Sequence, residues 1–156
     1  MDMGVQAVKR LRMYDLTVSG VTNRAVDGRR NAKLHNTTIT GSGHEALTAT
    51  KLRLENCVIR GNGIGVRSAG PSPAVHGHVV RVFNSTITGN LGIGVEGIRL
   101  RVKDSVVVNN SLDPSCGVTH NCNFDIGSYR KLRAKNVTCN YSFDSRACGG
   151  CPDEGP

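Results

Sequence analysis

The sequence has no tryptophan, and aromatic residues make up only 4% of its 156 positions. Proteins that bind unpaired nucleobases or neutral sugars stack them on aromatic side chains, so this shortage disfavours both kinds of ligand. No apolar run is long enough to span a membrane, and the N-terminal stretch "MDMGVQAVKR" lacks the apolar segment of a signal peptide. We therefore expect no transmembrane segment, and nucleic acid is a less favoured partner.

Several signatures of catalysis are also missing. The chain has no phosphate-binding loop, no GxSxG, no HExxH and no dinucleotide fingerprint. Glycoside hydrolysis needs two carboxylates flanking one bond, and no Asp/Glu pair recurs at one position of the repeats described below. "HGH" at 76–78 supplies two histidines without a third ligand. We expect no metal and no cofactor.

A short strand-turn-strand pattern recurs along the chain, as in "AKLHNTTITGS" (32–42), "LRLENCVIRGN" (52–62), "VRVFNSTITGN" (80–90) and "LRVKDSVVVNN" (100–110). Each copy has an Asn or Asp at its corner, which we call the anchor. The anchors are Asp15, Asn36, Asn56, Asn84, Asp104 and Asn136. Apolar residues lie two and four positions before each anchor and mostly three after it, which predicts strands with one buried face. Gly-Asn then marks a second bend.

Anchors are 20 or 21 residues apart, except for two longer steps of 28 and 32 residues. The long steps locate Gly-, Pro-, Ser- and Asn-rich insertions at 68–78 and 109–124. Loops on a rigid repeat scaffold often carry function. We expect a single domain over 1–156, with coils from about 9 to 143 and a C-terminal cap or tail over 139–156.

With its "LRLENCVIRGNGIGV" and "VRVFNSTITGNLGIGV" coils, the chain resembles the right-handed parallel β-helix proteins over residues 9–143. That superfamily includes pectate and alginate lyases and many uncharacterised secreted bacterial proteins. The resemblance implies an all-β fold: one right-handed solenoid of about six coils, each with three short strands, and a Cys-rich C-terminal cap. It transfers no catalytic residue to this sequence.

Basic residues recur three and five positions before the anchors. The first row comprises Arg12, Lys33, Arg53, Arg81, Arg101 and Arg133. The second row comprises Arg10, Lys51, Arg99 and Lys131, with Asn31 and Val79 interrupting it. We call the two rows together the basic ladder. Both positions alternate with buried ones and must face solvent, where neighbouring coils would stack the charges about 4.8 Å apart.

Stacked like charges repel, so the basic ladder is not a device for stability. A linear array of positive charge matches a linear polyanion, and the scarcity of aromatics favours an acidic polysaccharide or the phosphates of a lipopolysaccharide surface. We therefore expect a non-catalytic binding module. One alternative is that the ladder only solubilises the sheet. Another is a small polysaccharide lyase using Arg101, Lys103, Arg133 and Lys135. A third is an end-to-end homo-oligomer, because residues 1–8 offer no cap for the first coil.

Five of the six cysteines lie near the C-terminus: Cys116, Cys122, Cys139, Cys148 and Cys151. This tail resembles the Cys-bearing ends of uncharacterised secreted bacterial β-helix proteins. We expect Cys116 to pair with Cys122, and Cys139 with Cys148 or Cys151. Disulfides indicate an extracellular or cell-surface protein whose leader is absent from this sequence. A zinc site and free thiols remain alternatives. Cys57 occupies the repeat position of Ser85 and Ser105 and should stay unpaired.

Overall fold

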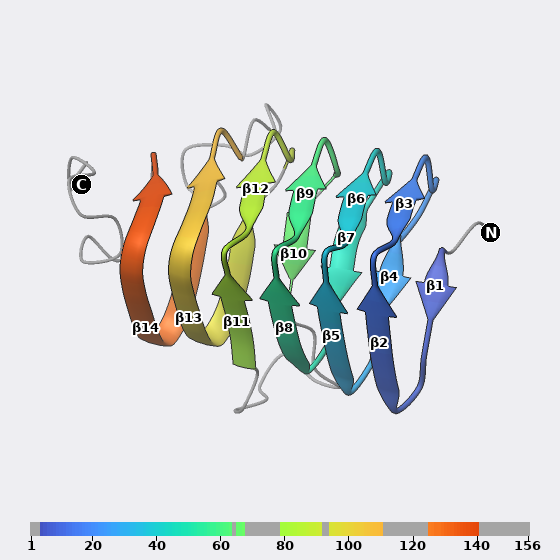
Figure 1. Cartoon of the computed structure of the whole chain (residues 1–156), viewed down its shortest axis with the longest axis horizontal. Helices are drawn as coiled ribbons and strands as arrows, with labels where there is room; N and C mark the ends of the chain where they lie inside the picture. The colour runs from blue at the N-terminus through green and yellow to red at the C-terminus, as the bar shows by residue number, and fades with distance from the viewer. Residues whose placement is uncertain (1–3, 64, 68–78, 92–93, 111–124, 141–156) are drawn as a thin grey trace.

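The computed structural model describes residues 4–63, 65–67, 79–91, 94–110 and 125–140. All regular secondary structure in these residues is β-strand, and every strand pair is parallel. Strands one repeat apart lie side by side along the long axis of the molecule (Figure 1). The all-β, parallel arrangement predicted from the repeat is confirmed. It is compatible with a parallel β-helix.

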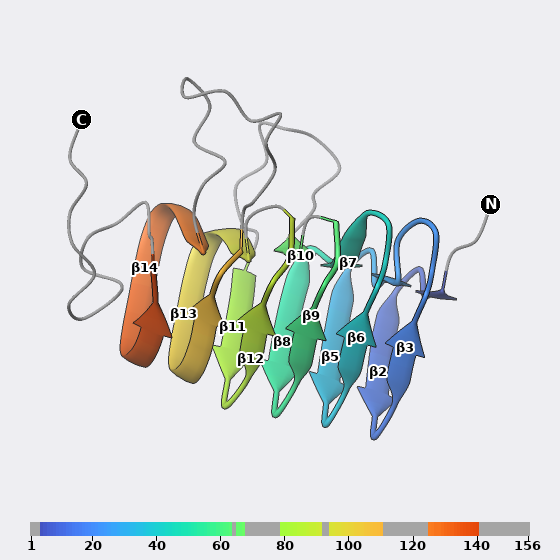
Figure 2. The ribbon, with the colours of Figure 1, turned by 90° about the horizontal axis from the view of Figure 1, so that it is seen from above.

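Three ladders of strands run along this axis. The first contains β1 (Val5–Gln6), β4 (Val26–Asp27), β7 (Glu45–Thr48) and β10 (Gly65–Arg67). The second contains β2 (Arg10–Tyr14), β5 (Asn31–His35), β8 (Lys51–Glu55) and β11 (Val79–Phe83). The third contains β3 (Thr17–Ser19), β6 (Thr38–Thr40), β9 (Val58–Arg60) and β12 (Thr86–Thr88). Figure 2 shows the second and third ladders adjacent to one another.

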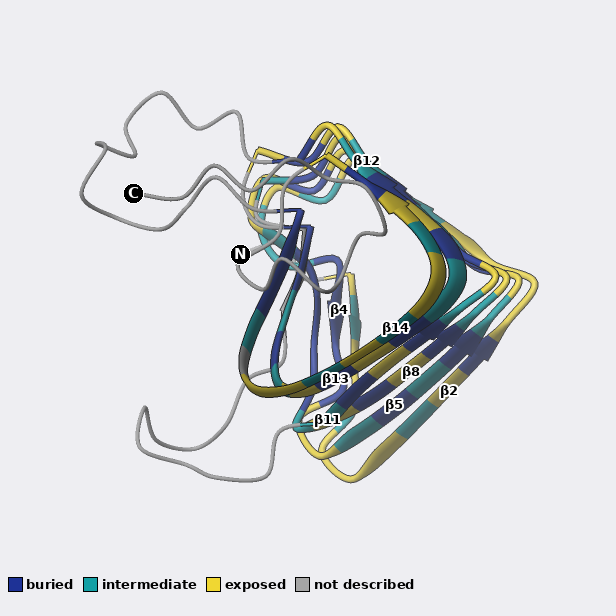
Figure 3. Cartoon of the chain, turned by 90° about the vertical axis from the view of Figure 1, so that its left-hand side faces the viewer, coloured by how far each residue is buried: buried dark blue, intermediate teal, exposed yellow. Residues whose placement is uncertain are grey.

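Two strands are longer than the sequence predicted. β13 (Val95–Val108) pairs with β10, β11 and β12 in turn, and β14 (Ile126–Cys139) pairs with β13 along its length. The three short sheets expected from the sequence are therefore joined into one 14-stranded sheet. Viewed end on, this sheet is curled, with bands of buried residues along its strands (Figure 3).

Two sharp bends per repeat produce the curl. All six anchors have a positive φ, between 46° and 54°. Asn and Asp tolerate this left-handed conformation better than other residues with a side chain, which explains their recurrence at the corner. Five positions after the first five anchors, a second positive φ falls on Gly20, Gly41, Gly61, Gly89 and Asn109. Both predicted bends are confirmed.

The core consists of the apolar residues predicted to face inward. Leu34, Leu54, Val82 and Val102 are fully buried in the second ladder, and Ile39, Ile59, Ile87 and Val107 in the third. Fully burying one such side chain contributes about 1.5–3 kcal/mol. In the first repeat, Met13 continues the first of these rows and is buried, whereas Val18, in register with Ile39, and Leu11, in register with Ala32, are only partly buried against this core. In the described chain they have a neighbouring repeat on one side only, so their outer surface is uncovered.

A buried chain of asparagines crosses the second bend. Asn62, Asn90 and Asn110 are 1%, 1% and 5% exposed. The Nδ2 of Asn62 donates to Oδ1 of Asn90 (3.0 Å), Asn90 donates likewise to Asn110 (2.7 Å), and Asn110 donates to Oδ1 of Asp125 (2.9 Å). Each amide also donates to a carbonyl of the preceding repeat: Ile39, Ile59 and Ile87 respectively. These bonds connect successive repeats through side chains as well as through the backbone.

Most of the predicted insertions and tail cannot be compared with the structure. Residues 68–78, residues 111–124 of the second insertion and residues 141–156 of the tail lie outside the described residues.

Candidate anion-binding face

The parallel register brings the whole first row of the basic ladder together. Arg12 pairs with Lys33, Lys33 with Arg53, Arg53 with Arg81, Arg81 with Arg101, and Arg101 with Arg133. Lys33 is half-buried and the other five are exposed. The alternation of strand residues is the reason, since β8 reads exposed, buried, exposed, buried along "KLRL". The predicted position of the row is confirmed, whereas its role in binding stays a prediction.

The second row is also in register and exposed. Arg10, Lys51, Arg99 and Lys131 occupy one line across the strands, and Asn31 and Val79 occupy the two remaining places in it. All four basic side chains are exposed. The ten residues of the basic ladder therefore lie on one face of β2, β5, β8 and β11 and of the parts of β13 and β14 that continue these strands.

This face is hollowed into a groove of about 640 Å³. Its lining residues come from β2, β5, β8, β11 and β13: Arg10, Leu11, Arg12, Asn31, Ala32, Lys33, Lys51, Leu52, Arg53, Val79, Arg81 and Arg99. Seven of these side chains are basic, and none of the described residues lining the groove is acidic. A groove lined by one sign of charge concentrates counterions of the opposite sign. It runs across the strands, so a ligand filling it would lie along the stack.

The charges on this face are almost unneutralised. Among the residues that the structure describes, only Arg53 of the ladder forms an ion pair, to Glu55 at 3.3 Å. Neighbouring like charges about 4.8 Å apart repel by roughly 1 kcal/mol per pair in water and by more near a protein surface. A bound polyanion would relieve that repulsion.

One aromatic ring lies among the arginines. The guanidinium carbon of Arg53 is 5.2 Å from the centroid of the Phe83 ring, and that of Arg101 is 5.6 Å from it. These arginines belong to β8 and β13, the strands on either side of β11. Both distances are within the range of cation–π attraction. Phe83 thus contacts two members of the first row without neutralising their charge.

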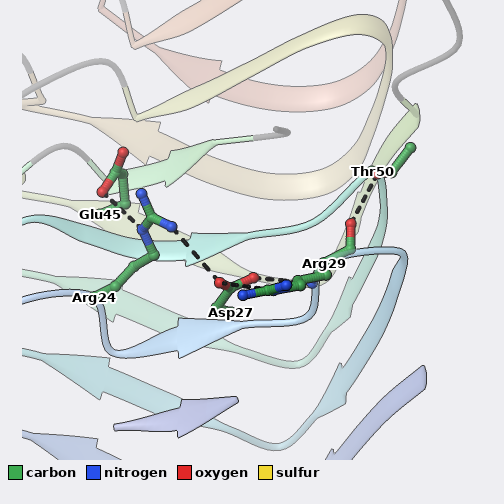
Figure 4. Close-up of polar contacts among 5 residues, drawn as sticks. All are labelled: Arg24, Asp27, Arg29, Glu45 and Thr50. Atoms are coloured by element: carbon green, nitrogen blue, oxygen red, sulfur yellow. Dashed lines mark hydrogen bonds and ion pairs between the residues drawn. The ribbon is translucent and has the colours of Figure 1, made fainter. Parts of the chain in front are cut away.

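Two arginines outside the ladder are paired with acids, unlike most members of the ladder. Arg24 contacts Glu45 at 3.2 Å and Asp27 at 3.7 Å, and Nε of Arg29 lies 4.0 Å from Asp27 (Figure 4). Asp27 is buried and also accepts a hydrogen bond from the backbone N–H of Arg29. Here acids hold the arginines in place. The basic ladder has no comparable set of acids.

Lysines widen the basic face on its two last strands. The four side chains proposed for the lyase alternative are neighbours, since Arg101 pairs with Arg133 and Lys103 with Lys135. Lys103 also contacts Asp104 at 2.9 Å. The Lys103 bond, followed by the Asn136 amide, lowers the pKa of the Asp104 carboxyl below its ordinary value. The Asp104 carboxylate beside these cations is bonded to Lys103 and to the Asn136 amide, so the arrangement does not identify a catalytic base.

The cysteines are only partly covered by the structure. Cys57 is a free, buried cysteine, as predicted, and burial raises the pKa of its thiol. Cys139 is disulfide-bonded. Cys116, Cys122, Cys148 and Cys151 lie outside the described residues, so the pairing stays a prediction. No group of three metal-ligating side chains occurs in the part of the chain that is described, and His76 and His78 fall outside it.

Sequence reasoning located the rows but missed two features of the face. The groove depends on how side chains of five strands pack, which spacing alone does not give. The contacts of Phe83 depend on diagonal neighbours across strands, two positions further along the chain than Arg81. In the sequence, the only indication of these contacts is that Phe83 lies on the same side of its strand as Arg81, a member of the first row.

No protein-family model, curated protein or solved structure matches the chain. Within the described residues, no helical segment has the length and apolar character that a membrane crossing requires.

Proposed function

We propose that this chain is a right-handed parallel β-helix of about six coils that binds an acidic linear polysaccharide through the basic ladder, without catalysis, outside the cell. The number of coils rests on the six anchors. The right-handedness of the solenoid rests on the general preference for right-handed crossovers between parallel strands. The extracellular location rests on the cysteine-rich C-terminal region.

The single observation that supports binding is the continuous first row. Six basic side chains stand in strict register on consecutive strands, and five of the six have no ion pair in the described part of the chain. Repulsion along the row costs free energy that a merely soluble surface could avoid by mixing signs. An anionic polymer lying along the row would place its charges opposite those of the protein.

Charge reversal within and outside the row tests this proposal. Arg81→Glu should weaken binding to alginate, pectate or heparin and flatten the dependence of log affinity on log salt, because fewer counterions are released. Arg53→Glu combined with Arg81→Glu should have a larger effect. Arg60→Glu on β9 makes the same change of net charge at an exposed strand position outside the ladder, so it is the matched control. Affinity chromatography at several salt concentrations measures how strongly each of these variants binds the polymers.

Two results would contradict the proposal. If the wild-type protein passes through all three columns at low salt, the ladder is only a solvated face. If Arg60→Glu weakens retention as much as Arg81→Glu, net charge rather than the row determines binding. Circular dichroism must show that each variant keeps its β-structure.

A lyase is a second candidate, supported by the four neighbouring cations on β13 and β14. Elimination of a uronate requires a base together with a cation that neutralises the carboxylate. A lyase would generate an unsaturated uronate with ultraviolet absorbance, whereas a binding module would leave the polymer intact. Incubation with pectate and alginate followed by absorbance separates the two functions.

An end-to-end homo-oligomer is a third candidate. β1, β2 and β3 pair on one side only among the described strands, and Val8 and Leu16 of this repeat are 63% and 48% exposed. Unpaired strand edges can pair with another chain. Sedimentation velocity over a range of concentrations tests this, and a concentration-independent monomer would exclude it.

A further inference from the structure

Phe83 is the one aromatic residue that contacts arginines of the first row among the described residues. It lies on β11, on the same side of the strand as Arg81 and two positions beyond it. The strands on its two sides each supply one guanidinium, from Arg53 and Arg101. One ring therefore contacts the two arginines that flank Arg81 in the row.

The distances show what this contact does to the arginines. Two strand spacings, about 9.6 Å, separate the backbones of β8 and β13. The guanidinium carbons of Arg53 and Arg101 lie 5.2 and 5.6 Å from the centroid of one ring on the intervening strand, so the same ring contacts both side chains. A free arginine side chain has several rotatable bonds and would sample many positions. The ring thus restricts the positions of two of three consecutive arginines.

We propose that Phe83 is a positioning residue that sets the ligand specificity of the basic ladder. Arg53, Arg81 and Arg101 extend from backbones at single-strand intervals of about 4.8 Å, and the ring fixes the outer two of these three side chains. Such an array fits a polymer that carries a carboxylate on every sugar residue better than one with a carboxylate on every second residue. The planar guanidinium fork binds carboxylates in a bidentate manner, so a fixed position improves the match. This inference rests on the proposed binding function.

Two polymers and four proteins test the specificity. Polygalacturonate carries a carboxylate on every residue, and hyaluronan carries one on every second residue. Wild-type protein should bind polygalacturonate more tightly at equal carboxylate concentration and equal salt. Phe83→Leu should weaken that binding about three- to tenfold, because two arginines lose their fixed positions and must be ordered when the polymer binds, and it should reduce the preference. Its salt dependence should stay unchanged, because no charge is removed.

Phe83→Tyr keeps an aromatic ring and should retain both affinity and preference. Tyr14→Leu is the matched control, because Tyr14 occupies the same repeat position in β2 and contacts His35 rather than an arginine. Equal affinity of the wild type for the two polymers would overturn the inference. So would Phe83→Leu with unaltered preference, or Tyr14→Leu with the same loss. Thermal unfolding of each variant separates a loss of fold from a loss of specificity.

A measurement without ligand keeps this inference distinct from the binding function. In the free protein, NMR relaxation of arginine Nε–H groups should show Arg53 and Arg101 more ordered than Arg81, and Phe83→Leu should remove the difference. Arg101 is the decisive residue, since it has no ion pair in the described chain. Equal mobility of Arg81 and Arg101 in the wild type would refute positioning by the ring. Order at Arg101 with no binding to either polymer would instead refute the proposed function, and the specificity with it.

Discussion

Asparagine plays two separate roles at the scale of single residues. At Asn36, Asn56, Asn84 and Asn136 it is exposed and provides a left-handed backbone conformation. At Asn62, Asn90 and Asn110 it is buried, and its side chain supplies hydrogen bonds that the bend would otherwise lack. The sequence marked both sets as turn residues and could not separate them. Burial of the second set depends on the neighbouring repeats, which no single repeat encodes.

Replacing Asn90 tests the buried set. Asn90→Ala removes the acceptor of the Asn62 backbone N–H and amide, and the donor to the Ile59 carbonyl. Leaving such buried groups unsatisfied should lower the free energy of unfolding by about 2–3 kcal/mol. Asn31→Ala is the control, because Asn31 is half-buried and its side chain has no hydrogen bond among the described residues; it should change stability by less than about 0.5 kcal/mol. Urea unfolding measures both, and equal effects would contradict the assignment.

The repeat predicted much of the fold at the scale of elements, because period-two alternation and corner residues are local signals. It gave the three strands of each repeat, their register and their buried faces. It did not predict that β13 and β14 run unbroken through the bends. Asp104 has the same positive φ as the other anchors, yet it lies inside one continuous strand. Continuity is set by pairing along the whole of β14, which is a property of two repeats together.

The contacts of Asp104 between these two strands predict a response to pH. Its folded pKa is lowered, so ionised Asp104 stabilises the fold above its unfolded pKa, and that contribution is lost as the pH falls through the folded value. Lys103→Gln should raise the pKa of Asp104 most, since the Lys103 bond is the largest cause, and Asn136→Ala should raise it less. Carboxyl carbon NMR during an acid titration measures the shifts. Lys131→Gln removes an equal charge without touching Asp104 and should have little effect.

The charge of the whole molecule is concentrated on one side. Net charge is +8, and half of the 20 basic residues belong to the basic ladder. The core and the stacked bends must outweigh this repulsion for the chain to stay folded. Sequence analysis predicted the positions of these charges, because strand alternation alone fixes which face they occupy. It could not predict that Arg53 alone of the ladder forms an ion pair among the described residues, because this depends on where the acids lie in space.

Ionic strength should therefore stabilise the protein. Adding sodium chloride to a low-salt buffer should raise the melting temperature by roughly 2–4 °C for each kcal/mol of repulsion that is screened. Arg81→Gln removes one charge from the middle of the row and should reduce this gain, whereas Arg60→Gln outside the row should leave it largely intact. Differential scanning calorimetry measures the midpoints. A melting temperature independent of salt would show that the ladder is not under electrostatic strain.

The buried asparagine chain gives the stack a polarity. Every amide in it receives a hydrogen bond from the repeat before and passes one to the repeat after, until the last one reaches Asp125. The Asp125 carboxylate accepts this hydrogen bond and has no N–H of its own to donate, so the series of amide-to-amide hydrogen bonds ends at Asp125. The side chains of asparagine and aspartate differ in one group: asparagine has an NH₂ that donates hydrogen bonds, and aspartate has an oxygen that accepts them. The series of side-chain hydrogen bonds therefore runs in one direction along the stack, from Asn62 to the carboxylate of Asp125.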